Sequence, residues 1–133
     1  MEFYYLDPED IRYLHDEMIE EYGGIYGENE SGMIDYMADK PKQYLFEQEI
    51  YPDLFQKAAV YLEGFATHQY FCDGNKRTGV KCCLTFLLIN GYELIVEDYD
   101  LYKITLEVAN KRMDIDEITQ WLESNCVKNF SGI

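Results

Sequence analysis

The segment from Lys76 to Asn90 constrains the fold more than any other part of the chain. It carries the longest and most hydrophobic helical pattern in the sequence, with apolar residues on most sides. A helix that is apolar all round needs neighbours to bury it. Its longest apolar run, around Cys82 to Ile89, is far too short to span a bilayer. We therefore predict that this helix forms the centre of a helical bundle, with Cys82 and Cys83 as small core residues.

Five further segments carry helical spacing or helix-capping signals. They run from Asp7 to Gly23, Ser31 to Ala38, Asp53 to Thr67, Tyr99 to Lys111 and Asp114 to Ser124. Ser31, Asp7 and Asp114 are suited to cap the helices that follow them. A short extended piece near 92–96 is the most β-structure that we expect. With 133 residues and no internal repeat, the sequence predicts a single all-α domain over residues 1–133.

The net charge is strongly negative, because 26 Asp and Glu residues outnumber 11 Lys and Arg residues and give −15. This balance argues against binding to nucleic acid or to an anionic membrane through a broad basic face. Lys76, Arg77 and Lys81 are the exception, since they place three of the eleven cations within six positions. Such a basic island suggests a small anion site, and ordinary scatter of charge on a helix surface is the alternative.

The N-terminal sequence lacks the basic region and the long apolar stretch of a signal peptide. The four cysteines, Cys72, Cys82, Cys83 and Cys126, show neither a CxxC spacing nor a paired spacing with histidine. That pattern supports neither a zinc site nor a redox motif. We expect reduced thiols and a cytoplasmic protein.

The residues just before the central helix combine most of the groups that a phosphate site needs. Gly74 allows close approach of a ligand, and the next residues open a helix whose free N–H groups attract anions. Lys76 and Arg77 add full positive charges, and Asp73 offers a carboxylate of the kind that holds Mg²⁺. Asn75 can donate to a phosphate oxygen or orient the loop. A plain turn with an Asx cap explains this stretch about equally well.

The run from Phe71 to Thr78 resembles the active-site motif of the Fic/Doc (Fido) superfamily, in its death-on-curing branch. The similarity continues at the opening, in the middle and at Asn90 to Leu94, so that it covers about residues 3–124. It implies a compact Fido-type helical bundle in which the two helices flanking the loop form the centre. It also implies that residues 1–133 make one Fido/Doc-like domain.

The resemblance implies an enzyme that uses ATP with Mg²⁺ and modifies a hydroxyl of a protein. Asp73 would hold Mg²⁺, and Gly74, Asn75, Lys76 and Arg77 would bind phosphates. Family members with Gly in the place of Lys76 usually transfer AMP. The death-on-curing branch has Lys there and transfers the terminal phosphoryl group. The resemblance therefore favours a toxin-type phosphotransferase, with AMP transfer as an alternative.

Two positions depart from the family motif: Tyr70 replaces the usual small residue or proline, and the position before it is the serious departure. The family has a histidine two residues before the phenylalanine, as general base on the target hydroxyl, and Gln69 stands there. An amide can hydrogen-bond a hydroxyl but cannot take its proton, so we expect weakened catalysis. Alternatively, His68 swings into the base position if the loop bulges by one residue. A third hypothesis is a Fido pseudoenzyme, which binds a nucleotide or a protein without catalysis.

The resemblance also implies protein partners. The target would be a cytosolic protein such as a translation factor, and the death-on-curing branch is normally restrained by a small antitoxin. The aromatic segment from Tyr44 to Tyr51 would either line a groove for one of these partners or pack under its own loop.

Overall fold

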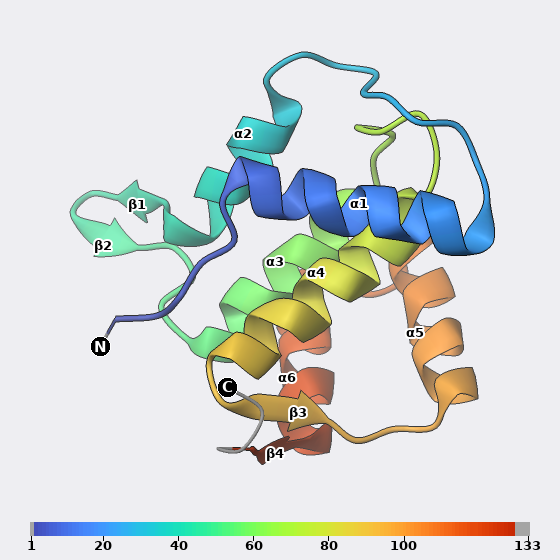
Figure 1. The fold of residues 1–133 in the computed structure, drawn as a ribbon. Coiled ribbons are helices and arrows are strands. Elements are labelled where there is room, and N and C mark those ends of the chain that lie inside the picture. The colour runs from blue at the N-terminus through green and yellow to red at the C-terminus, as the bar shows by residue number, and fades with distance from the viewer. Residues whose placement is uncertain (1, 130–133) are drawn as a thin grey trace.

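The structure, a computed structural model, describes residues 2–129 and is drawn in Figure 1. Within this range the chain forms six α-helices, one 3-10 helix and two small antiparallel sheets. The helices are α1 (Pro8–Tyr22), α2 (Met33–Asp39), η1 (Lys40–Lys42), α3 (Leu54–Ala66), α4 (Asn75–Ile89), α5 (Asp98–Ala109) and α6 (Ile115–Asn125). The strands are β1 (Tyr44–Leu45), β2 (Gln48–Glu49), β3 (Tyr92–Leu94) and β4 (Cys126–Lys128).

Helices α3 and α4 form the centre of the molecule, and α1, α5 and α6 pack around them, so the predicted helical bundle is confirmed (Figure 1). Cys82 and Cys83 are fully buried. At Gly79 the two central helices touch, because a Cβ there would lie 3.1 Å from Cβ of Phe65 and 3.2 Å from the carbonyl oxygen of Leu62. Among residues 2–129, no helix is both long and apolar enough to cross a membrane.

Aspartate caps fix where three of the helices begin. Asp7 accepts a hydrogen bond from the main-chain N–H of Asp10 at 2.8 Å, and Asp114 accepts one from that of Glu117 at 2.9 Å. Asp53 caps α3 in the same way. Such caps satisfy N–H groups that have no partner within the helix. The predicted cap at Ser31 is wrong, because α2 begins after Gly32 without a side-chain cap.

The β-structure is more extensive than the sequence predicts. The expected piece near 92–96 is β3, and β4 pairs with it antiparallel, with Tyr92 opposite Lys128. Strands β1 and β2 form a hairpin that turns through Phe46 and Glu47, both with positive φ. Strands of two residues carry no alternation that a sequence pattern could detect. Figure 1 shows this hairpin projecting from the helical body.

The β1–β2 hairpin exposes its aromatic residues. Tyr44 is 65% exposed and Phe46 is 90% exposed, so the interpretation in which they pack under their own loop is wrong for these two. Lys57 of α3, whose side chain is fully buried, contacts the hairpin. Its Nζ donates to Oε1 of Glu49 and to the carbonyl oxygen of Pro41, each at 2.8 Å. A lysine on the buried face of α3 thus ties the hairpin to the core.

The buried thiols allow a direct test of this core. Burial raises the pKa of Cys82 and Cys83 well above the ordinary thiol range and that of Cys126 to about 11. Because alkylation requires the thiolate, we expect iodoacetamide at pH 8 to label the half-buried Cys72 first. Cys82 and Cys83 should react only after unfolding in urea, as measured by peptide mass spectrometry. Labelling of Cys83 in the folded protein would contradict the packing of α4.

Candidate functional site

The loop from Thr67 to Gly74 joins the two central helices and is paired with the segment from Gly27 to Asn29. The main-chain N–H of Cys72 donates to the carbonyl oxygen of Gly27 at 2.9 Å. The main-chain N–H of Asn29 donates to the carbonyl oxygen of Tyr70 at 2.8 Å. The side-chain Nδ2 of Asn29 donates to the main-chain carbonyl oxygen of Gln69, also at 2.8 Å. Main-chain hydrogen bonds to a remote segment therefore fix the path of the loop.

Gly74 makes the turn into α4 in the left-handed conformation, with φ 76° and ψ 19°. A Cβ at this position would also lie 3.2 Å from Cδ1 of Ile19, so another residue would be both strained and crowded. The first helical hydrogen bond runs from the N–H of Thr78 to the carbonyl oxygen of Gly74. The main-chain N–H groups of residues 75–77 are consequently left for a ligand or for water.

The side chain of Asn75 orients the loop, which was one of the two roles that the sequence left open. Its Oδ1 accepts from the main-chain N–H of Phe71 at 3.0 Å, and its Nδ2 donates to the carbonyl oxygen of Phe71 at 2.9 Å. The second N–H of Nδ2 donates to Oε1 of Gln69 at 3.3 Å. Since both amide hydrogens are used inside the loop, only the main-chain N–H of Asn75 is left to bind a phosphate.

His15 of α1 contacts the same loop through a hydrogen bond and a ring stack. Its ring is buried and stacks on the ring of Phe71, with centroids 3.7 Å apart. Its Nε2 lies 2.8 Å from the carbonyl oxygen of Asp73, to which it can donate, and its Nδ1 lies 3.1 Å from Oδ1 of Asp16. His15 lies 58 residues before Asp73, so no local spacing in the sequence connects it with the loop.

Asp73 is exposed next to Gly74 and keeps one carboxylate oxygen available. Its Oδ2 accepts from the main-chain N–H of Ile25 at 3.1 Å, whereas no residue within 2–129 donates to Oδ1. The described residues contain no group of three or more His, Cys, Asp or Glu side chains placed to hold a metal ion. One carboxylate with a spare oxygen is nevertheless what Mg²⁺ uses when phosphates and water supply its other ligands.

A cleft of about 730 Å³ opens between α1, α4 and α5, and the loop forms one end of it. Its lining residues include Asp73, Gly74 and the cations Lys76, Arg77 and Lys81. None of these cations has a salt-bridge partner among residues 2–129. The predicted basic island therefore faces one cavity instead of being scattered over a surface.

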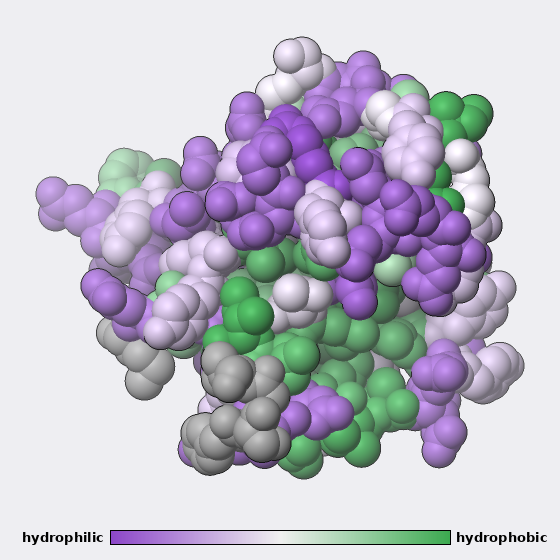
Figure 2. All heavy atoms as spheres, in the orientation of Figure 1, coloured by the Kyte–Doolittle hydropathy of each residue, from purple (hydrophilic) through white to green (hydrophobic). Residues whose placement is uncertain are grey.

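The rest of the lining mixes apolar side chains with Tyr102, Thr105 and the two carboxylates of Glu21 and Asp98. Its apolar lining residues are Met18, Val80, Leu84, Leu101 and Leu106. On the surface, Figure 2 shows hydrophilic residues over α1 and hydrophobic residues below it, along α4. Tyr22 lines the cleft as well, and its ring carries the guanidinium of Arg77 at 4.3 Å from the centroid. No sequence signal points to Tyr22 except its place beside Gly23.

His68 and Gln69 face different neighbours. The Nδ1 of His68 lies 3.0 Å from the carbonyl oxygen of Gly64, at the end of α3, and its ring stacks on that of Tyr70. Neither residue is among those that line the cleft, but Gln69 contacts Asn75, which is. The structure thus brings Gln69, not His68, to the residues that open α4.

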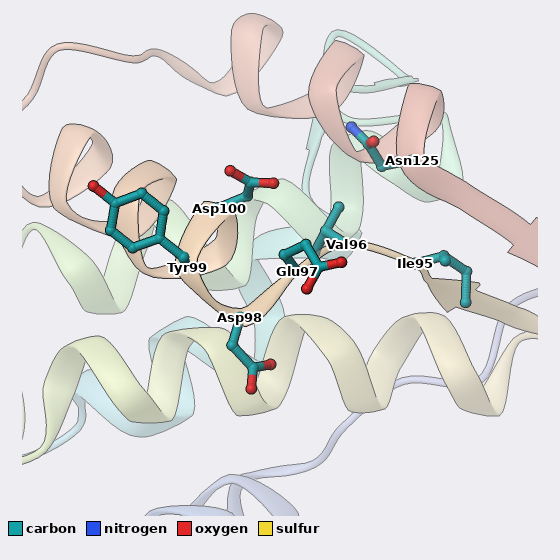
Figure 3. A pocket seen from close by; sticks show the side chains of 7 residues that line it. All are labelled: Ile95, Val96, Glu97, Asp98, Tyr99, Asp100 and Asn125. Atoms are coloured by element: carbon teal, nitrogen blue, oxygen red, sulfur yellow. The ribbon is translucent and has the colours of Figure 1, made fainter.

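A second hollow lies where the chain passes from β3 into α5. Glu97, Asp98 and Asp100 line it together with Asn125, whose carbonyl oxygen accepts from the N–H of Ile95. Figure 3 shows that the carboxylates of Asp98 and Asp100 point to opposite sides of the chain. They do not converge on a common point, so this hollow provides no clustered ligands.

Comparison with known proteins agrees with this geometry. The sequence profile of the Fic/DOC family matches residues 5–87, which span α1 to α4 and include the whole loop. The chain belongs to the Fic/DOC family. It is 35% identical over 100 residues to Toxin Doc of Mycolicibacterium smegmatis, an alignment that covers 73% of this chain and 76% of that protein. It is 30% identical over 118 residues to the protein kinase doc of Escherichia phage P1, which covers 89% of this chain and 92% of that protein.

Both relatives are Doc proteins, so the chain lies in the death-on-curing branch of the Fic/DOC family. The family region contains every site residue predicted from the sequence, from His68 to Arg77. It also contains His15 and Tyr22, the two residues that only the structure connects with the loop and its cleft.

Proposed function

We propose that this protein is a Doc-like, toxin-type phosphotransferase that uses ATP with Mg²⁺ to modify a hydroxyl of a cytoplasmic protein. The observation that carries the proposal is the polar end of the cleft, where Lys76 and Arg77 have no ion-pair partner and Asp73 has a spare oxygen. The name of the phage relative, a protein kinase, supports transfer of the terminal phosphoryl group. Lys76 itself favours this reaction over transfer of AMP.

The roles of the residues follow from their placement. The main-chain N–H groups of residues 75–77 and the side chains of Lys76 and Arg77 bind phosphate oxygens and balance their charge. Asp73 would hold Mg²⁺, which supplies further charge neutralisation between the phosphates when bound. Gly74 lets the phosphates approach the main chain closely. In phosphoryl transfer such positioning and charge stabilisation provide most of the catalysis.

The proposed enzyme lacks the general base of the family, because Gln69 occupies the position of the family histidine. An amide does not accept a proton near neutral pH, so we propose that turnover is slow. The second candidate function is a pseudoenzyme that binds nucleotide or protein without transfer. Gln69 favours the pseudoenzyme, because it cannot act as a base. The placement of His68 against α3, outside the lining of the cleft, favours it as well.

We also propose an antitoxin partner, because one relative is named Toxin Doc. The apolar part of the cleft is suited to an amphipathic segment of such a partner, and the strongly acidic surface of α1 favours a basic one. Target recognition is assigned to the exposed hairpin with Phe46 at its tip. A cytoplasmic location agrees with the four free thiols.

The proposal is tested with ATP labelled on the γ- or the α-phosphate and a bacterial extract. Transfer of the γ-label to a protein by the wild type, and its loss in Asp73→Asn, is the expected result. Asparagine keeps one oxygen as an acceptor for the N–H of Ile25 and removes the charge and the second oxygen. Transfer of the α-label would favour AMP transfer. Binding of Mg-ATP without any transfer would favour the pseudoenzyme, and loss of transfer in His68→Ala would make His68 the base.

Tyr22 offers a test of how the phosphate site is arranged. Its ring supports the guanidinium of Arg77 at the edge of the cleft and leaves the N–H groups free for a phosphate. An exposed cation–π contact contributes about 0.5–1 kcal/mol, so Tyr22→Leu should weaken binding of Mg-ATP about two- to fivefold. Tyr22→Phe keeps the ring and should bind like the wild type. Equal affinities of all three proteins in isothermal titration calorimetry would contradict this arrangement.

A further inference from the structure

The orientation of the Gln69 amide is fixed by a chain of hydrogen bonds that starts at the main chain. The main-chain N–H of Phe71 can only donate and its carbonyl oxygen can only accept, so the two groups determine which end of the Asn75 amide is oxygen and which is nitrogen. The Nδ2 of Asn75 therefore faces Gln69 as a donor. The atom of Gln69 at 3.3 Å from it has to be the acceptor, Oε1.

The outward end of Gln69 is consequently its N–H₂ group. The residue is exposed, and its main-chain carbonyl is held by the side chain of Asn29, so the starting point of the side chain is fixed as well. Nε2 lies on the side of the amide away from Asn75 and has no acceptor among residues 2–129. Gln69 is not itself among the lining residues of the cleft, but Asn75 is, so the side chain presents two N–H donors beside the residues that open α4.

We infer that Gln69 is a donor to a phosphoryl oxygen, and that it helps the site to recognise a phosphate group instead of activating a hydroxyl. The inference rests on the proposed nucleotide site. A group that has its acceptor oxygen turned inward cannot attract the proton of a hydroxyl, but it matches the oxygens of a phosphate. Lys76 and Arg77 provide the charge at the start of α4, and Gln69 adds a neutral donor held beside Asn75, the first residue of that helix.

The phosphoryl oxygen can belong to either of two molecules. One is the terminal phosphate of the bound nucleotide, and the other is the phosphorylated side chain of the target, which is the product of the proposed reaction. In both cases the same N–H₂ group makes the contact. Because Asn75 already holds the amide in place, little conformational entropy is lost when the ligand binds.

The experiment compares wild type with Gln69→Met, which keeps the length of the side chain and removes its donors. Binding of Mg-ATP, Mg-ADP and O-phosphothreonine is measured by isothermal titration calorimetry. Gln120→Met is the matched control, because Gln120 is an exposed glutamine on α6, remote from the loop in the fold. Thermal unfolding of each protein establishes that it is folded.

A hydrogen bond to a charged group predicts a loss of about tenfold in affinity. A loss for Mg-ATP with Mg-ADP unchanged assigns the donor to the terminal phosphate. A loss for O-phosphothreonine alone assigns it to the modified target. Equal losses for both nucleotides would mean that Gln69 only supports the loop, and unchanged affinities would mean that it faces no ligand; either result overturns the inference. If the wild type binds none of the three, the proposed nucleotide site fails first.

Discussion

Replacing Gln69 with histidine is expected to raise the rate of phosphoryl transfer by a factor of about 10² to 10⁴, the usual contribution of a general base. The imidazole titrates close to neutral pH and accepts the proton of a target hydroxyl, which an amide does not. The position is suitable because Gln69 is exposed and contacts Asn75, at the start of α4. The measurement is the initial rate of γ-label transfer from ATP to the target protein.

The gain has to depend on the rest of the site. Adding Asp73→Asn to Gln69→His should abolish it, because the carboxylate that would hold Mg²⁺ is then lost. His68→Ala should leave the gain intact, since the ring of His68 lies against α3 and Tyr70. If the single variant Gln69→His is no faster than wild type, Gln69 does not stand in the place of the family base.

The helical framework was predictable from the sequence because its signals are local. The caps Asp7 and Asp114 and the apolar run of α4 each act within a few residues, and the structure places these helices accordingly. The loop motif was predictable for the same reason, since Asp73 and the cations that follow it are neighbours in the chain. The resemblance to the death-on-curing branch is confirmed by the two Doc relatives.

The groups that shape the site could not be predicted, because they come from distant parts of the chain. His15 reaches Asp73, Asn29 holds the carbonyl of Gln69, and Tyr22 lies under Arg77. Their contacts depend on how α1 crosses the central helices, which no spacing within the sequence encodes. The orientation of the Gln69 amide could not be predicted either, because it follows from a hydrogen bond to Asn75 that forms only in the folded loop.

The β1–β2 hairpin was missed for a different reason. Its two strands have two residues each, and what stabilises it is a buried lysine eight residues beyond β2. Lys57 lies on the apolar face of α3, with the rings of Tyr5 and Phe3 at 5.5 and 5.9 Å from its Nζ. A lysine on a buried helical face was the available signal, because such a charge needs a partner.

The largest effect on stability is therefore expected from removing the partner of this lysine. Glu49→Ala leaves the ammonium of Lys57 buried with only a carbonyl oxygen and two rings beside it. Breaking a buried pair in this way typically costs 3–5 kcal/mol, and we expect about 3 kcal/mol because Glu49 is about one-third exposed. The free energy of unfolding is measured by urea denaturation.

The double variant Glu49→Ala/Lys57→Met separates the buried charge from the hairpin contact. Methionine fills a similar volume without a charge, so the double variant should be more stable than Glu49→Ala alone. Glu107→Ala is the matched control, because it removes an exposed ion pair with Arg112 and should change the stability by less than about 1 kcal/mol. If the double variant is no more stable than Glu49→Ala, the unpaired ammonium is not what destabilises the protein. The lost stability would then come from the contact between Glu49 and Lys57 that holds the hairpin, and the position of Phe46 would depend on that contact.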